Sequence, residues 1–267
     1  MGSRSWLTAV LAAALAAGAL TGCSSGETRV TVVAGTTLVD GRLLERVTAD
    51  YEGRRPDVRL SVVGAPSARA LALAEAGSAD VTITHDPALE ERFIAEGRGE
   101  LATEVFSSRF ILAGPRPESG ALKGMSAVEA FRWIAEQGHP FVSRADGSGT
   151  YQVEREIWDR VGVDPTGREW YVETRQGMGL TLQVASQREA FVLVELSVFL
   201  TAEKTTGLLD AALDPAGLEN PYRAIAVKGS PVREESLAFV EWLGSRSGRE
   251  AVRRANLELY GAQIFEP

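Results

Sequence analysis

The sequence is poor in the side chains that most often bind transition metals. Its 267 residues include one cysteine, Cys23, and two histidines, His85 and His139. A lone cysteine excludes an internal disulfide bond, and so few sulfur and imidazole groups argue against a site for zinc or a similar metal. We therefore expect neither a metal site nor a cofactor.

Sequence signs of catalysis are also scarce. The chain has no Gly-x-x-x-x-Gly-Lys-[Ser/Thr] loop of the kind that binds nucleotide phosphates. Ser148 is a candidate nucleophile, but its surroundings read Asp-Gly-Ser-Gly-Thr and lack the Gly-x-Ser-x-Gly turn of many hydrolases. We therefore predict that the chain is not an enzyme.

Positive charge is in short supply as well. The formal net charge is −8, and removal of residues 1–22, whose only charged residue is Arg4, makes it −9 (−8 − 1 = −9). The sequence contains no basic stripe or cluster, which argues against nucleic acid and against an anionic membrane surface as partners. An acidic protein can still bind a small anion, because local dipoles and one or two cations suffice.

The longest apolar run lies near the N-terminus, where Trp6–Leu20 follows Arg4. A membrane span needs about 20 apolar residues, so this run has the length of a signal-peptide core instead. Next comes Leu20-Thr21-Gly22-Cys23, which resembles the bacterial lipobox, whose cysteine becomes the lipidated first residue of the mature protein. We predict a signal peptide over residues 1–22, a tether over 23–27, and an exported protein anchored by lipid on Cys23. The alternative is an ordinary secretory signal with a spare thiol.

Strand and helix signals alternate through the rest of the chain. Runs rich in β-branched residues predict strands at 29–34, 58–63, 79–84, 110–113, 141–143, 191–194 and 222–227. Helical spacing predicts helices at 41–54, 67–76 with Ser67 as N-cap, 87–96, 126–137, 152–161, 181–189, and 234–254 with a break at 244–248. The βαβαβ order favours an α/β fold with a doubly wound sheet, whose ligands lie beyond the carboxyl ends of the strands.

The mature chain is long enough for two lobes, since 267 − 22 leaves 245 residues. We predict that the chain crosses between lobes near Gly114 and returns near Pro221. The first lobe would then comprise residues 28–113 plus 222–267, and the second lobe residues 114–221.

The most informative turn is Ser143-Arg144-Ala145-Asp146-Gly147-Ser148-Gly149-Thr150, between a predicted strand and a predicted helix. Such a turn can direct several N–H groups and hydroxyls at one anion, and the helix N-terminus adds about half a positive charge. Arg144 supplies a planar, always charged fork for oxyanion oxygens. Asp146 could hold Arg144 in place or accept a proton from a protonated anion. We predict Arg144, Ser148, Gly149 and Thr150 as ligand-binding residues; the alternative is a glycine-rich capped turn.

Two weaker turns have the same character. Thr36 and Thr37 follow the first strand at a break before a helix, where they could bind a ligand or cap the helix. Gly177, Met178 and Gly179 precede another predicted helix, and the small glycines would let backbone amides approach a ligand closely. An ordinary flexible turn explains this second segment equally well.

Taken together, segments along nearly the whole mature chain resemble the tungstate-binding proteins of ABC importers, within the type II periplasmic-binding fold. The matching segments are Thr36-Thr37, 79–81, His85-Asp86-Pro87, 110–115, 140–144, 146–150, 169–171, 173–179, 220–222 and 224–227. The resemblance implies two lobes, each a doubly wound sheet flanked by helices, that close on a tetrahedral oxyanion. It also implies delivery of the anion to a permease with its ATPase.

The chain departs from the family's pattern at several ligand positions. Leu38 and Val39 follow Thr36-Thr37 where the family continues with hydroxyl residues. Val194 and Leu196 stand where the family has a threonine and an arginine, which leaves Glu195 alone as a polar residue. Ser108-Arg109 replaces an Asn-Asp pair, so Arg109 could offset the lost arginine.

These features predict a lipid-anchored, extracytoplasmic protein that captures tungstate or molybdate for an ABC importer. Phosphate or another anion on the same fold is one alternative, favoured by Arg144, Asp146 and the Ser-Gly-Thr turn. A lipoprotein sensor or interaction module that has lost ligand binding is the other, favoured by the apolar Val194 and Leu196. An acceptor-only oxyanion should meet donors and no unpaired carboxylate.

Overall fold

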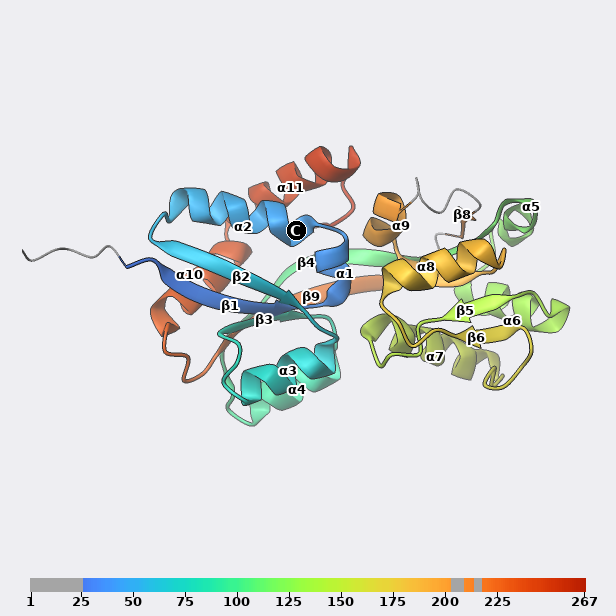
Figure 1. Cartoon of the computed structure of the whole chain (residues 1–267), viewed down its shortest axis with the longest axis horizontal. Coiled ribbons are helices and arrows are strands. Elements are labelled where there is room, and N and C mark those ends of the chain that lie inside the picture. The colour runs from blue at the N-terminus through green and yellow to red at the C-terminus, as the bar shows by residue number, and fades with distance from the viewer. Residues whose placement is uncertain (1–25, 203–208, 214–217) are drawn as a thin grey trace, which may run out of the picture.

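The computed structural model describes residues 26–202, 209–213 and 218–267, and its elements form two lobes side by side (Figure 1). The predicted signal peptide over residues 1–22, the first tether residues and Cys23 lie outside the described residues. Among the described residues, no helix is long and apolar enough to cross a membrane.

The first lobe is built on a sheet that begins with three parallel strands in the order β2-β1-β3. Their bounds are Thr28–Ala34 for β1, Val58–Gly64 for β2 and Val81–Thr84 for β3. Side chains of successive strand residues point to opposite faces, so Val32 and Val33 enter different core clusters. The predicted βαβαβ start is confirmed.

Helices cover both faces of this sheet (Figure 1). Buried residues of the helices above and behind it join Val32 in one cluster, and those of the helices below join Val33 in another. The first set is α2 (Leu43–Arg54), α10 (Arg233–Gly244) and α11 (Arg246–Tyr260), and the second is α3 (Ser67–Glu75) and α4 (Pro87–Ala95).

Two details of the predicted helices are corrected. The first predicted helix is preceded by a separate short helix, α1 (Thr36–Asp40), and Arg42 between α1 and α2 has a left-handed backbone with φ of 63°. Ser67 is not the N-cap of α3, because Pro66 occupies that position. The Ser67 hydroxyl instead accepts a hydrogen bond from the backbone N–H of His85 at 3.5 Å.

Two antiparallel strands connect the lobes. β9 (Glu219–Val227) pairs with β3, and β4 (Gly99–Pro115) pairs with β9 as far as Arg109. From Phe110 onward β4 pairs with β7 (Val192–Glu195) and then β8 (Leu209–Leu213) of the second lobe. The sequence predicted only residues 110–113 of β4, because the earlier part begins with alternating half-buried and exposed positions and lacks an apolar run.

The second lobe packs helices around β5 (Phe141–Ser143), β6 (Tyr171–Glu173) and β7. β5 and β6 are parallel, and Phe141 bridges to Phe191 beside β7. An aromatic cluster that includes Phe131, Phe141 and Trp158 fills the lobe. The surrounding helices are α5 (Arg116–Ser119), the 3₁₀ turn η1 (Gly120–Leu122), α6 (Ala127–Gln137), α7 (Gly149–Val161), α8 (Met178–Gln187) and α9 (Leu196–Ala202).

The exact division of the chain between lobes stays a prediction. β4 changes its pairing partner between Arg109 and Phe110, ahead of the predicted crossover near Gly114. β9 begins at Glu219, before the predicted return near Pro221.

Candidate oxyanion site

The turn between β5 and α7 is held by its own side chains. Ala145 and Gly147 adopt positive φ angles of 47° and 72°, which fold the backbone back on itself. Asp146 Oδ1 accepts from the Ser148 N–H at 3.1 Å, and Ser148 Oγ caps α7 by accepting from the Tyr151 N–H at 3.3 Å. The helix therefore starts at Gly149, with its first N–H groups free of any preceding helical carbonyl.

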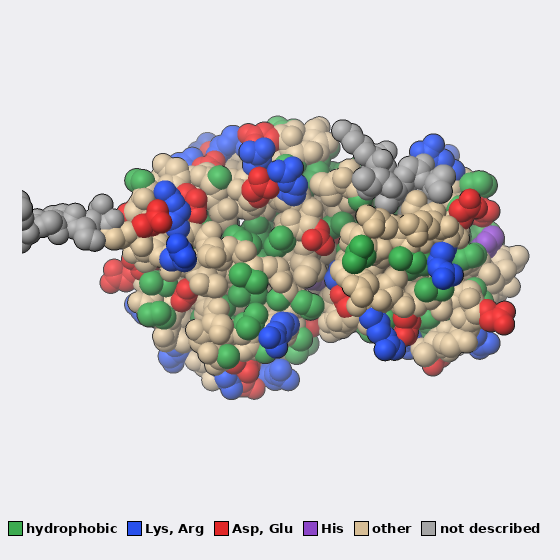
Figure 2. Space-filling model, in the orientation of Figure 1, with side chains coloured by type: hydrophobic (Ala, Val, Ile, Leu, Met, Phe, Trp, Pro, Cys, Tyr) green, Lys and Arg blue, Asp and Glu red, His purple; other side chains and the backbone are tan. Residues whose placement is uncertain are grey.

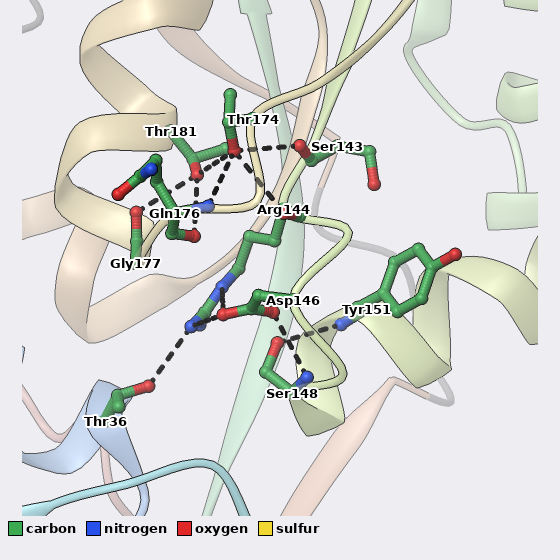
Figure 3. Close-up of polar contacts among 10 residues, drawn as sticks. All are labelled: Thr36, Ser143, Arg144, Asp146, Ser148, Tyr151, Thr174, Gln176, Gly177 and Thr181. Carbon is green, nitrogen blue, oxygen red and sulfur yellow. Dashed lines mark hydrogen bonds and ion pairs between the residues drawn. The ribbon is translucent and has the colours of Figure 1, made fainter. Parts of the chain in front are cut away.

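Arg144 reaches from this turn to the other lobe (Figure 3). Its side chain is 1% exposed, and its Nε and Nη2 donate to Asp146 Oδ2 at 3.1 and 2.5 Å. Nη2 also donates to Thr36 Oγ1 in α1 at 3.3 Å. The structure thus brings together Thr36 and Arg144, which sequence analysis had selected from separate turns, and Asp146 holds the guanidinium.

Three buried side-chain atoms in the segment from Ser143 to Thr150 have no hydrogen-bond partner among the described residues. They are Ser143 Oγ, Arg144 Nη1 and Thr150 Oγ1. A buried donor without a partner costs roughly 1–3 kcal/mol, and more when charged. Arg144 Nη1 and Thr150 Oγ1 are therefore candidate donors to an oxyanion, and the N–H groups at the start of α7 are further candidates.

The Thr37 hydroxyl is committed to a buried network. Tyr222 donates its hydrogen to Glu195 Oε2, so the Tyr222 oxygen accepts from Thr37 Oγ1 at 2.7 Å. A threonine has one hydroxyl hydrogen, and for Thr37 it goes to Tyr222. Among the groups of Thr37, only the backbone N–H remains to donate to a ligand.

The same network accounts for Glu195, which is fully buried at the end of β7. Its Oε2 accepts from Tyr222 and from Asn220 Nδ2 at 3.2 Å, and its Oε1 accepts from Ser197 at 2.7 Å. Glu195 is therefore not an unpaired carboxylate facing a ligand. Val194 and Leu196 beside it are buried in the main core cluster.

The predicted segment Gly177–Gly179 stands at the start of α8, where Gly177 is the N-cap. The side chain of Met178 is fully buried in the main core cluster, and the two glycines are exposed. Next to them, Thr174 Oγ1 lies 2.8 Å from Thr181 Oγ1 and donates to the Ser143 carbonyl at 3.1 Å (Figure 3). This link connects the α8 turn to the residue preceding Arg144. Any ligand contact of this segment stays a prediction and would come from its backbone.

Sequence analysis missed the supporting roles of His85, Asn220 and Tyr222. The His85 Nδ1 lies 2.8 Å from Asn220 Oδ1, and burial lowers the pKa of His85, which favours the neutral ring. Both segments, His85-Asp86-Pro87 and Asn220-Pro221-Tyr222, were part of the family resemblance, which was the only signal available for them. Arg109 lies in β4 opposite Glu219 of β9.

Two further polar features bear on the class of ligand. No group of three or more histidine, cysteine or acidic residues in the described part of the chain could hold a metal ion. On the face shown in Figure 2, basic and acidic side chains are interspersed over both lobes. Recognition would therefore depend on local donors.

Residues 22–246 match the family model of the PBP superfamily domain. The fold is that of this class of binding proteins, and the predicted α/β periplasmic-binding fold is confirmed. The prediction that the chain is not an enzyme agrees with this class.

Individual relatives narrow the class. The tungstate-binding protein TupA of Peptoclostridium acidaminophilum is 31% identical over 98% of this chain and 96% of that protein. The solved tungstate ABC transporter from Geobacter sulfurreducens is 31% identical, covers 86% of this chain and 99% of its own, and has a TM-score of 0.77. TupA from Desulfovibrio alaskensis G20 is 25% identical over 90% of this chain and 98% of its own, with a TM-score of 0.76. The chain belongs to the TupA family of tungstate-binding proteins.

Proposed function

We propose that this chain is an extracytoplasmic solute-binding protein that captures a tetrahedral oxyanion, tungstate or molybdate, for an ABC importer. The names of its relatives support the transporter and the class of ligand. A permease with its ATPase would be the partner that receives the anion.

One observation carries the proposal. Arg144 is buried and anchored by Asp146 and Thr36, yet its Nη1 has no partner among the described residues. Tungstate and molybdate offer only acceptors, which matches this guanidinium nitrogen, the Thr150 hydroxyl and the first N–H groups of α7. The carboxylates nearby, Asp146 and Glu195, have donors of their own, so neither requires a protonated ligand.

Closure of the lobes follows from the placement of these donors. Thr36 belongs to the first lobe, and Arg144 and Thr150 belong to the second. An anion bound between them interacts with both sets only when the lobes meet. Its higher affinity for that state shifts the population toward the closed form.

Calorimetric titration of residues 24–267 with tungstate, molybdate, sulfate and phosphate tests the proposal. We expect tungstate and molybdate to bind more tightly than sulfate and phosphate. Tight binding of phosphate alone would establish the alternative ligand on the same fold. No heat with any of the four anions would overturn oxyanion capture and favour a sensor or interaction module.

The variant Arg144→Lys sharpens this test. Lysine keeps the charge and loses the planar fork, and a charged hydrogen bond contributes about 1.5–3 kcal/mol. We therefore expect the affinity for tungstate to fall roughly ten- to a hundredfold. The matched control is Arg175→Lys, whose parent side chain is 77% exposed and paired with Glu173; it should bind as the wild type does.

We also propose that a lipid on Cys23 anchors the protein to the extracytoplasmic face of the membrane. The support is the ordered sequence of Arg4, the apolar run and Leu20-Thr21-Gly22-Cys23. After expression of the full chain in a bacterium, the wild type should sediment with membranes, and Cys23→Ser should not be lipidated. Equal amounts of both proteins in the soluble fraction would contradict the anchor.

A further inference from the structure

His85 of the first lobe lies against Gly149 of the second. A methyl group added at Gly149 would be 2.1 Å from His85 Cε1 and 2.6 Å from Nδ1, well inside van der Waals contact. On the other side of the ring, a methyl group at Gly35 would be 3.4 Å from Cδ2. The imidazole therefore occupies the space that a side chain at position 149 would need.

The ring is not free to move aside. Its Nδ1 lies 2.8 Å from Asn220 Oδ1, and its ring contacts that of Tyr222 with 5.0 Å between centroids and an angle of 41° between the ring planes. The Asn220 amide nitrogen donates to Glu195 and to the Tyr222 hydroxyl, which leaves Asn220 Oδ1 to accept from His85. The ring thus carries its hydrogen on Nδ1 and is bound to a fully hydrogen-bonded buried network.

That network stands where the chain passes between the lobes. Asn220 and Tyr222 belong to β9, and Ser108, the register partner of Asn220, belongs to β4. These are the two strands that connect the lobes. His85 is therefore held in a fixed position relative to the two connecting strands, whereas Gly149 belongs to α7 of the second lobe.

From this geometry we propose that His85 is a positioning residue that sets the closed spacing of the lobes, with the bare backbone at Gly149 as its contact surface. The contact fixes how near α7 comes to α1, and so how near Arg144 and Thr150 come to Thr36. It thereby sets the size of the anion that both lobes enclose. The role of this spacing in ligand capture rests on the proposed oxyanion function.

Gly149→Ala tests the contact. Position 149 is the first residue of α7 and has no positive φ, so alanine suits the helix itself. The added methyl should instead meet His85 and hold the lobes apart, and we expect the affinity for tungstate to fall at least about tenfold. The control is Gly53→Ala in α2, where nothing lies within 4 Å of the added methyl.

The double variant His85→Ala/Gly149→Ala separates this role from others. Removal of the ring makes room for the methyl, so the double variant should regain affinity to within roughly tenfold of the wild type. A methyl that obstructed the anion directly, or that disturbed α7, would not be relieved in this way. An unaffected single variant, or a double variant as weak as the single one, would overturn the proposal.

A distance measurement keeps the inference separate from ligand identity. Spin labels on Glu91→Cys and Glu156→Cys, exposed positions on α4 and α7, report the distance between lobes in a Cys23→Ser background. We expect the labelled protein without further changes to show a population with a short distance between the lobes. Gly149→Ala should lose this population, and the double variant should regain it. If no anion binds to the wild type, the proposed function fails, and the distance distributions alone then test the contact between His85 and Gly149. Identical distributions in all three proteins would then overturn the contact.

Discussion

Glu154 is a buried carboxyl group of α7, the helix that follows the turn carrying Arg144. Its Oε1 accepts from the Tyr171 hydroxyl at 2.6 Å and from Trp158 Nε1 at 3.3 Å. Burial outweighs these hydrogen bonds and raises the pKa of Glu154 from 4.5 to about 7. The folded protein therefore binds this proton more tightly than the unfolded chain does.

The pH dependence of stability follows with a definite sign. The contribution of protonated Glu154 to the free energy of unfolding is complete below pH 4.5 and is lost as the pH rises toward about 7. The free energy of unfolding falls by up to about 1.4 kcal/mol per pH unit over this range. Glu154→Gln keeps an oxygen that accepts from Tyr171 and Trp158 but cannot titrate. Urea unfolding across this range should show that the stability difference between wild type and variant falls as the pH rises. Parallel curves would contradict the assignment.

The roles of individual residues in the candidate site could be predicted from the sequence only in part. Arg144 and Thr36 could be selected because their type and turn context point to anion binding. The commitment of the Thr37 hydroxyl to Tyr222 could not be foreseen, because Thr37 lies in α1 and Tyr222 in β9, 185 residues further along the chain. Sequence analysis left two roles open for Asp146, and the hydrogen bonds from Arg144 support the first of them, in which Asp146 holds the guanidinium.

Among the elements, the junction of α10 and α11 makes a sharp stability prediction. A methyl group at Gly248 would lie 2.1 Å from the Trp242 carbonyl oxygen and 2.6 Å from that of Leu243. Backbone atoms cannot rotate away, so Gly248→Ala should lower the free energy of unfolding by about 1–3 kcal/mol. Gly53→Ala, in open space within α2, should raise it by up to about 1 kcal/mol. Chemical denaturation of both variants provides the comparison, and equal effects would refute the close-contact argument.

Elements with a strong local signal were predicted to within a few residues. The valine-rich β1 and β2 and the helix break between α10 and α11 are examples. β6 and α9 were missed, because β6 is three residues long and α9 continues directly from β7. Short elements such as these form through their neighbours, and their own sequence carries little periodicity.

At the scale of the whole molecule, the two lobes are joined by packed side chains as well as by the two connecting strands. The largest core cluster includes Val32 and Ile83 from the first lobe together with Met178 and Leu182 from α8 of the second, and α8 packs against α1. Apolar contact between the lobes thus accompanies the polar contact of Arg144 with Thr36. The predicted boundaries at residues 113 and 222 divide the chain, but they do not divide this core.

Local sequence by itself determined the alternation of strands and helices, the capped glycine-rich turn before α7, and the supply of one cation and several hydroxyls for an anion. These features depend on interactions between residues close in the chain, and so they can be recognised from the sequence pattern. Only the tertiary structure decided that Arg144 meets Thr36, that Glu195 is satisfied internally, and that His85 rests on Gly149. Those contacts join residues from different elements, and their distances depend on how the sheet and its two connecting strands bring the lobes together.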